Sequence, residues 1–331
     1  MSAERTPPGG AARTGSSGDR TPAARAADAT PAPRTALAYL RRATEFLAAR
    51  GVATARLDAE VLLASVLATD RIGVYLRFDQ PLAPREVDAY RELVRRRAAG
   101  EPVAYLIGSR EFWSIPLAVT PDVLIPRPET ELLVERALAV VAVASTEPPA
   151  APTPRRILDL GTGSGALAIA LARELPHALV TAVDVSPRAA AIAAANARRA
   201  GVADRVEVVV GSWTAALDPA TRFDVIVSNP PYVPTAALAA LSAEVRAEPV
   251  VALDGGDDGL AAYRALVPGA AAHLAPGGWL LVEVGVGQAE AVAAIMAAAG
   301  LRGVAWHTDL AGVSRVVAAT AAIAAVTEVA V

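Results

Sequence analysis

The 331-residue chain contains no cysteine and no lysine, so all 31 of its basic residues are arginine. Without cysteine it can form neither a disulfide nor a thiolate-held zinc or iron–sulfur site, and it has no thiol nucleophile. Without lysine it lacks the cation of a Walker-A phosphate loop and the amine of a Schiff-base mechanism. GC-rich coding DNA is a sufficient explanation for the preference for arginine, and these chemistries are excluded whatever its origin.

Aromatic residues make up only 4% of the chain although 53% of it is hydrophobic, so alanine and valine must fill much of the interior. No uninterrupted apolar run reaches the roughly 18–20 residues that a membrane-spanning helix requires. The formal net charge of −3 argues against a broad basic surface for duplex nucleic acid. We therefore expect a soluble, cytoplasmic protein that contacts neither a membrane nor duplex nucleic acid.

Residues 1–34 are dominated by Pro, Gly, Ala, Ser, Thr and Arg and contain no apolar core of a secretory signal. This composition buries too little apolar surface to fold, which predicts a disordered extension. An arginine-rich start with Ser and Thr is also typical of organelle transit peptides, and that alternative stays open.

The rest of the chain is expected to form two domains and a connector. Apolar residues recur at helical spacing over 35–110, which predicts a small helical domain. Its one basic run, Arg95 to Arg97, is typical of a solvated helix end, with binding of an acidic partner as the alternative. Residues 111–130 carry four prolines and are expected to form a hairpin or connector. The second domain is expected over 131–331, with a linker at 145–154.

Strand-like and helix-like segments alternate after residue 156. We expect strands at 157–160, 180–185, 206–210, 223–228 and 279–285, and helices at 166–173, 187–200, 260–274 and 288–299. Such apolar, β-branched strands are typical of a parallel sheet covered by helices on both faces. Two last β-like segments, at 303–309 and 314–320, have no helix between them and predict an antiparallel edge. The expected fold class is therefore α/β.

A glycine-rich turn follows the first strand of this domain and precedes a helix. Glycines allow a tight bend and the close approach of a ligand to the backbone, and the helix N-terminus offers free N–H groups. The pattern alone also fits a dinucleotide-binding loop. Asp159 favours another ligand, because a carboxylate there would repel a pyrophosphate and suits a cationic group beside a ribose, as in S-adenosyl-L-methionine. The turn reads Asp159, Leu160, Gly161, Thr162, Gly163, Ser164, Gly165.

Two residues at the ends of the next strands are further candidates for cofactor binding. Asp184 ends the second strand, where an acid can accept hydrogen bonds from both ribose hydroxyls. A cap on the helix that begins after Ser186 is its alternative role, and the two roles can coexist. Trp213 follows the third strand and is expected either to pack on an adenine ring or to fill the core.

The fourth strand leads into Asn229-Pro230-Pro231-Tyr232. Prolines cannot continue a central strand, and they stiffen the backbone while leaving their carbonyls free to accept. The Asn229 side-chain oxygen and the Pro230 carbonyl would give two acceptors aimed at one point, which matches an NH2 group. Tyr232 would then form a flat lid over this group.

With these motifs the chain resembles the class I, S-adenosyl-L-methionine-dependent methyltransferases that modify planar amino groups, and within them the protein-(glutamine-N5) methyltransferases of peptide chain release factors. Ser114 stands where this family usually has glycine. The resemblance covers about residues 36–320 and depends on RRRAAGEPVAYLIGSREFW (95–113), VLIPRPETELLVERAL (123–138), ILDLGTGSGALAIALA (157–172), VDVSPRAAAIAAANA (183–197), FDVIVSNPPYV (223–233) and EVRAEPVVALDGGDDGLAAYRAL (244–266).

The resemblance implies a Rossmann-like methyltransferase domain that binds S-adenosyl-L-methionine, without a metal. It implies that a class 1 release factor is the protein substrate, that the helical domain recognises it, and that its Gly-Gly-Gln loop enters the site. It also implies that Gly161 to Gly165, Asp184, Trp213 and Asn229 contact the cofactor, and that Asn229 to Tyr232 clasp the glutamine. Arg127 and Glu129 would lie near it, or would order the connector instead. We expect a monomer.

Three alternatives stay open from the residues alone. The same site would suit a glutamine methyltransferase of ribosomal protein L3. Adenine N6 presents the same NH2 geometry, although the small helical domain and the net charge of −3 argue against a duplex-reading enzyme. A dehydrogenase could use the glycine turn, but Asp159 and the Asn-Pro-Pro-Tyr motif argue against it.

Overall fold

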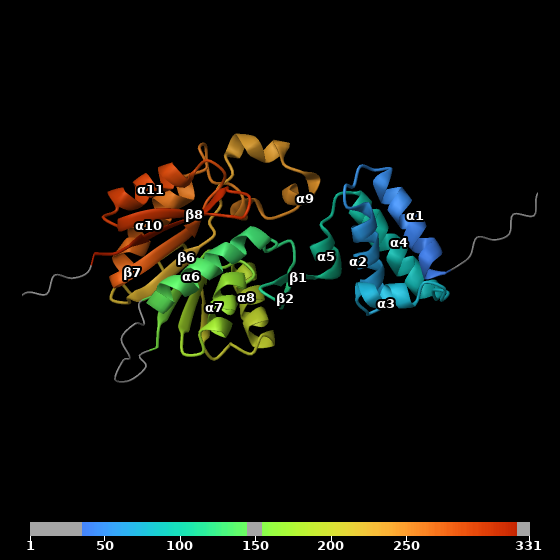
Figure 1. Cartoon of the computed structure of the whole chain (residues 1–331), viewed down its shortest axis with the longest axis horizontal. Helices are drawn as coiled ribbons and strands as arrows, with labels where there is room; N and C mark the ends of the chain where they lie inside the picture. The colour runs from blue at the N-terminus through green and yellow to red at the C-terminus, as the bar shows by residue number, and fades with distance from the viewer. Residues whose placement is uncertain (1–34, 144–153, 323–331) are drawn as a thin grey trace, which may run out of the picture.

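The structure is a computed structural model, and it describes residues 35–143 and 154–322. The predicted extension at 1–34 and nearly all of the predicted linker lie outside the described residues. Figure 1 shows a group of helices at one end of the molecule, a sheet with its helices at the other, and a small hairpin between them. Within the described ranges, no helix has the length and apolarity needed to cross a membrane.

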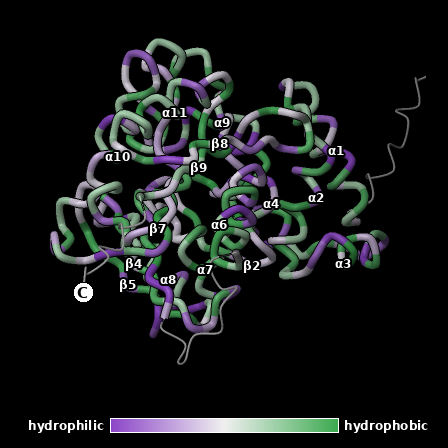
Figure 2. Tube along the Cα trace, turned by 60° about the vertical axis from the view of Figure 1, so that its left-hand side comes forward, coloured by the Kyte–Doolittle hydropathy of each residue, from purple (hydrophilic) through white to green (hydrophobic). Residues whose placement is uncertain are grey.

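The N-terminal part is helical, as the resemblance implied. Thr35 caps the first helix by accepting from the Ala38 backbone N–H at 3.3 Å, and Pro84 occupies the first turn of the fourth, where its missing N–H costs nothing. Tyr90 is buried at the centre and donates its hydroxyl to the Ala59 carbonyl at 2.9 Å. Figure 2 shows hydrophobic and hydrophilic segments alternating along these helices. The helices are α1 (Ala36–Ala48), α2 (Ala55–Val66), α3 (Arg71–Leu76), α4 (Pro84–Ala98) and α5 (Val103–Ile107).

The basic run at the end of α4 differs from the expectation of a solvated helix end. Arg95 is exposed, but Arg97 is only 3% exposed. Its Nε lies 2.6 Å from an Asp58 carboxylate oxygen on α2, and its Nη2 pairs with Glu244. Glu244 belongs to α9 (Ala243–Arg246), in the loop region beyond the sheet. Arg97 therefore ties the N-terminal helices to the sheet-containing part of the molecule.

The connector contains a hairpin of β1 (Ser109–Phe112) and β2 (Ile115–Ala118), closed by a two-residue turn. Both turn residues, Trp113 and Ser114, have positive φ angles, of 52° and 54°. This is the geometry of a type I′ turn, which matches the twist of the two strands and favours glycine or asparagine. The Trp113 indole anchors the hairpin by donating to Glu174 at 2.8 Å.

Replacing Ser114 by glycine is expected to stabilise the protein by up to about 1 kcal/mol, because the exposed serine holds a left-handed conformation that glycine adopts without strain. Urea unfolding would measure the change. Ser109→Gly is the matched control in strand β1 and is expected to lower stability. Equal effects of the two substitutions would contradict the role of the φ angle.

The larger sheet has seven strands in the order β5-β4-β3-β6-β7-β9-β8. β3 to β7 are parallel, and β9 and β8 complete an antiparallel edge, which confirms the predicted class. β7 begins five residues before the predicted strand, with a register shift against β6. The strands are β3 (Arg156–Leu160), β4 (Leu179–Asp184), β5 (Val206–Val210), β6 (Phe223–Ser228), β7 (Leu274–Glu283), β8 (Arg302–Thr308) and β9 (Ser314–Thr320).

Alternate residues of each strand face opposite sides of this sheet, and each side has its own core. Ile157 packs with α6, α7 and α8 on one face, and its neighbour Leu158 packs with α10 and α11 on the other. The flanking helices are α6 (Glu131–Val143), α7 (Ala166–Glu174), α8 (Pro187–Arg199), α10 (Ala261–His273) and α11 (Ala289–Ala298); the short 3-10 turns are η1 (Pro128–Thr130), η2 (Thr235–Ala240) and η3 (Val250–Ala252).

Candidate active site

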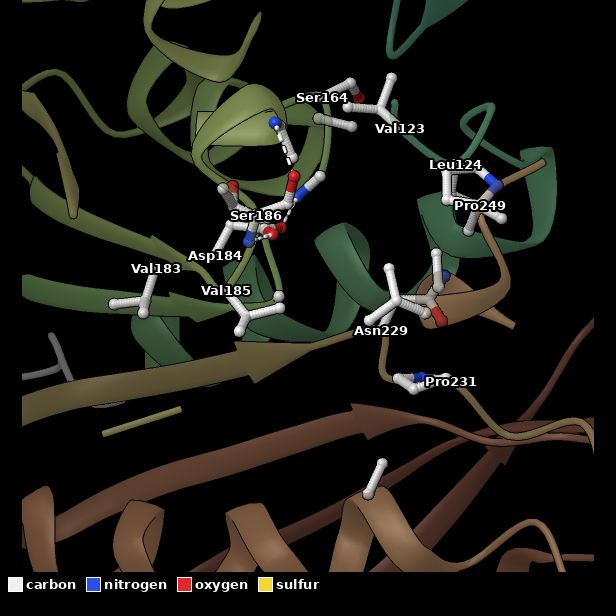
Figure 3. Close-up of a pocket in the computed structure, with 18 of the residues that line it drawn as sticks. Val123, Leu124, Ser164, Val183, Asp184, Val185, Ser186, Asn229, Pro231 and Pro249 are labelled. Carbon is white, nitrogen blue, oxygen red and sulfur yellow. Dashed lines mark hydrogen bonds between the residues drawn. The ribbon is translucent and has the colours of Figure 1, made fainter. Parts of the chain in front are cut away.

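The glycine-rich and polar segments meet at one edge of the sheet. β3 to β6 are parallel, so their carboxyl ends lie together. β3 has β4 on one side and β6 on the other, so the strand order reverses there, and such switch points are where open α/β sheets bind ligands. A pocket of 690 Å³ opens at this edge, and Figure 3 shows side chains from the ends of β4 and β6 lining it.

The glycine-rich loop after β3 forms one wall of the pocket. Gly161, Gly163 and Gly165 have left-handed φ angles of 74°, 57° and 84°, which glycine adopts readily. The backbone N–H groups of Gly161 and Thr162 donate to the Val183 carbonyl at 2.8 and 3.0 Å, which fixes the loop against β4. Gly165 packs towards α8 and does not line the pocket. The predicted loop residues that line it are Gly161, Thr162, Gly163 and Ser164.

Asp159 is fully buried beneath this loop and is not among the pocket-lining residues. One carboxylate oxygen accepts from the Thr162 hydroxyl at 2.6 Å and from the Ala168 backbone N–H at 3.2 Å. The other oxygen has no hydrogen-bond partner. Burial raises the pKa of this carboxyl to about 7, against the opposing effect of the two hydrogen bonds. Asp159 thus braces the loop and keeps one free acceptor; direct contact with a ligand stays a prediction.

Asp184 lies on the pocket wall at the end of β4 and is 9% exposed. One oxygen accepts from the Gly163 backbone N–H and the other from the Ser186 N–H, both at 2.8 Å. The cap on α8 is Ser186 itself, whose hydroxyl accepts from the Ala189 N–H at 3.2 Å. Each carboxylate oxygen has a further lone pair, so Asp184 can still accept from a ligand hydroxyl.

Trp213 lies beyond β5 with its indole beside the glycine loop. A Cβ added to Gly161 would come 3.7 Å from the Trp213 ring, so the absent side chain leaves the ring close to the backbone. Trp213 is partly buried against the core on the α10 side and also lines the pocket. Its backbone has a positive φ of 49°. Both expectations for this residue, core packing and a flat ligand-facing surface, are compatible with this position.

Asn229 follows β6 and lines the pocket opposite the glycine loop. Its side-chain nitrogen donates to the Thr130 hydroxyl oxygen at 3.1 Å. Among the described residues, no donor reaches its side-chain oxygen or the Pro230 carbonyl. The two acceptors that the sequence suggested are therefore both unused by the protein.

The rest of the Asn-Pro-Pro-Tyr segment divides between pocket and core. Pro231 lines the pocket and Pro230 is buried. Tyr232 is partly buried against the core and does not line the pocket, and its backbone carbonyl accepts from Gln288 at 3.0 Å. Burial, with the nearby Glu283 carboxylate, raises the pKa of Tyr232 to about 12. A role as a lid stays a prediction.

Arg127 lines the pocket and pairs with Glu248, a buried carboxylate in the loop before η3. Glu248 also accepts from the Ile125 backbone N–H at 3.1 Å. Arg127 therefore orders the connector and also lies at the pocket. Its position is compatible with both of the roles expected for it. Glu129 is exposed and does not line the pocket.

Several residues at this edge were not found from the sequence. Thr130 lines the pocket beside Asn229 and donates its hydroxyl to a carboxylate oxygen of the buried Glu283 at 2.6 Å. Asn196 on α8 donates to the Ser164 carbonyl at 2.9 Å and so supports the glycine loop. An acid at the end of an apolar strand, as Glu283 is, was the available signal. The remaining walls come from the connector and from η3, namely Val123, Leu124, Pro126, Pro249, Val250, Val251 and Ala252.

Comparisons with known proteins agree with this geometry. The family profile of the PrmC N-terminal domain matches residues 38–108, and that of the methyltransferase small domain matches residues 142–246. A release factor glutamine methyltransferase of Geobacter sulfurreducens is 49% identical over 82% of this chain and 92% of its own length. One of Cereibacter sphaeroides is 46% identical over 85% and 96%.

A likeness in fold extends further. The hMettl16 catalytic domain, solved in complex with a MAT2A 3'UTR hairpin, superposes with a TM-score of 0.51 at 15% identity, over 69% of this chain and 81% of that one.

Proposed function

The chain belongs to the family of release factor glutamine methyltransferases, and we propose that its target is the glutamine of the Gly-Gly-Gln motif in class 1 peptide chain release factors. It transfers a methyl group from S-adenosyl-L-methionine to a release factor glutamine. The observation that carries the finer proposal is the pair of unused acceptors, Asn229 Oδ1 on the pocket wall and the carbonyl of the next residue, Pro230. A glutamine side-chain amide has two N–H groups to donate to them.

The pocket fits the cofactor. Asp159 keeps a buried carboxylate oxygen without a partner, which suits a ligand that carries cationic groups. Gly161 and Gly163 leave backbone exposed to an approaching ligand, Asp184 offers acceptors to ribose hydroxyls, and Trp213 offers a flat surface to a purine. When bound, S-adenosyl-L-methionine supplies an electrophilic methyl group on a sulfonium.

The protein's part in the chemistry is to hold and aim a poor nucleophile. The lone pair of an amide nitrogen is delocalised, so it attacks only when the group is well positioned. Asn229 Oδ1 and the Pro230 carbonyl hold the two N–H bonds and aim the nitrogen into the pocket. They also stabilise the positive charge that develops on the nitrogen, and such preorganised dipoles are a large source of catalysis.

No dedicated base is required after transfer. The N-methylated amide nitrogen, still carrying both protons, is very acidic and releases one to water. The described histidines lie away from the pocket, and the His273 ring is 2.9 Å from the Thr221 carbonyl, where it has a structural role.

The release factor loop enters past exposed apolar side chains. Val250 and Val251 at the pocket wall are 61% and 60% exposed, which suits apolar contacts with an incoming peptide. Arg127 and Glu129 guide this loop, and Pro231 and Tyr232 support the glutamine. The N-terminal helices recognise the body of the release factor, since Arg97 links them to the loop region that carries η3. The enzyme acts as a monomer in the cytoplasm, where translation terminates.

The deciding experiment is transfer of a labelled methyl group to a purified class 1 release factor. Label is expected on the native factor and not on one whose Gly-Gly-Gln glutamine is replaced by alanine. Ribosomal protein L3 and an adenine-containing RNA serve as the other acceptors. Label on either of them, and none on the release factor, would refute the proposed substrate.

A further inference from the structure

A buried chain of hydrogen bonds runs from Asn229 to the end of β7. Asn229 Nδ2 lies 3.1 Å from Thr130 Oγ1, and Thr130 Oγ1 lies 2.6 Å from Glu283 Oε2. The second Glu283 oxygen lies 3.5 Å from the Tyr232 hydroxyl. Thr130 and Glu283 are 5% and 2% exposed; Thr130 reaches the pocket wall and Glu283 does not. Figure 3 shows Asn229 and Pro231 on the segment that follows β6.

We propose that Thr130 and Glu283 are positioning residues that determine which end of the Asn229 side-chain amide faces the substrate. This inference rests on the proposed function, because it assumes that the substrate group is a donor. The two ends of an asparagine amide have almost the same shape, so packing alone does not choose between them. A choice requires hydrogen bonds of defined direction.

The direction follows from proton counting. An ionised carboxylate can only accept, so the single Thr130 proton is donated to Glu283. Thr130 Oγ1 can then offer Asn229 only a lone pair, and Asn229 must present its N–H to it. Asn229 Oδ1 is thereby turned to the pocket as an acceptor. The opposite orientation would present N–H groups to the substrate NH2 and repel it.

The surroundings of Glu283 support this direction of the hydrogen bonds and determine the pH of the assay. Burial raises the pKa of Glu283 to about 7, and the nearby Glu129 charge raises it further. Thr130, Arg315 and Tyr232 act in the opposite direction, because they stabilise the charged carboxylate. The Tyr263 hydroxyl donates to the Glu283 backbone carbonyl at 2.9 Å and fixes this strand end. At about pH 8.5 the carboxyl is ionised, so rates are compared there.

The first test removes the hydroxyl of Thr130. Thr130→Val is expected to lower kcat at least about tenfold, because the amide loses its directional anchor, while the dissociation constant of S-adenosyl-L-methionine stays within about twofold. Thr130→Ser keeps the hydroxyl and is expected to retain most of kcat. Equal losses of kcat in the two variants, at matched thermal stability, would overturn the proposal.

The second test reverses the direction of the hydrogen bonds that join Asn229, Thr130 and Glu283. Asn229→Asp places a second acceptor against Thr130, whose one proton cannot serve two carboxylates, and is expected to lower kcat about 100-fold. Glu283→Gln alone is expected to lower kcat only a few-fold, because its amide oxygen can still accept. In the double variant its amide N–H donates to Thr130, which frees the Thr130 proton for the carboxylate at position 229. We expect kcat to recover at least about tenfold over Asn229→Asp.

Urea unfolding of the wild type, Asn229→Asp, Glu283→Gln and the double variant gives a readout that does not need a substrate. The unfolding midpoint of the double variant is expected to lie above that of Asn229→Asp. The wild type could fail to methylate the release factor while the unfolding midpoint of the double variant still lies above that of Asn229→Asp. In that case the proposed substrate is wrong and the hydrogen-bond direction stands. Midpoint shifts that simply add, or a double variant no faster than Asn229→Asp, would overturn the positioning role.

Discussion

Asn229→Ala is expected to abolish methylation of the release factor, with a fall in kcat of at least about 100-fold, the size of effect seen when one preorganised dipole is removed from an active site. The substitution removes the side-chain acceptor that holds one N–H of the substrate amide and leaves only the Pro230 carbonyl. Binding of S-adenosyl-L-methionine is expected to change little, because the glycine loop, Asp184 and Trp213 all belong to other strands.

The measurement combines labelled methyl transfer with calorimetric titration of the cofactor. Gln80→Ala is the matched control, since it removes an exposed side-chain amide far from the pocket and should leave both quantities unchanged. Near-wild-type turnover by Asn229→Ala would remove Asn229 from the catalytic machinery and, with it, the main support for amide recognition.

The second large effect is expected on cofactor affinity. Asp184→Ala removes a carboxylate that can accept from the ribose hydroxyls and also leaves the Gly163 and Ser186 N–H groups without their partner. Hydrogen bonds to a charged group contribute about 1.5–3 kcal/mol each, so S-adenosyl-L-methionine should bind about 100-fold more weakly. Calorimetric titration measures the dissociation constant directly.

Two further variants separate ligand contact from loop support. Asp184→Asn keeps one acceptor for the Gly163 N–H but loses the charge, so an intermediate loss of affinity is expected. Asp204→Ala removes an exposed acid outside the pocket and should bind the cofactor normally. Unchanged affinity in Asp184→Ala would exclude the ribose role.

The elements of the sheet domain could be predicted because their signals are local. The expected strand at 206–210 coincides with β5, and the helix expected at 187–200 differs from α8 by one residue. The glycine loop and Asn229 could be found for the same reason, since their residue types and their places at strand ends lie in one short stretch of chain. The β7 start was missed because a Pro-Gly-Gly stretch after Leu274 looks like a turn and becomes strand only through pairing with β6.

What could not be predicted depends on contacts between distant residues. Thr130 and Glu283 are 153 positions apart, and nothing near either of them in the sequence indicates the other. Arg97 looks like the third member of a solvated run, and only the fold brings Asp58 and Glu244 around it. A buried arginine between two acids is costly to unpair, so this contact is a firm link between the two parts of the molecule.

The Glu248 contacts have a consequence for the order of folding. Its carboxylate holds the Ile125 N–H and the Arg127 guanidinium across 123 and 121 positions of chain, and both segments contribute to the lining of the pocket. Closing so long a loop costs chain entropy, so such non-local contacts are expected to form after local helices and hairpins. The cofactor pocket is therefore expected to be completed only after the local helices and the β1–β2 hairpin have formed.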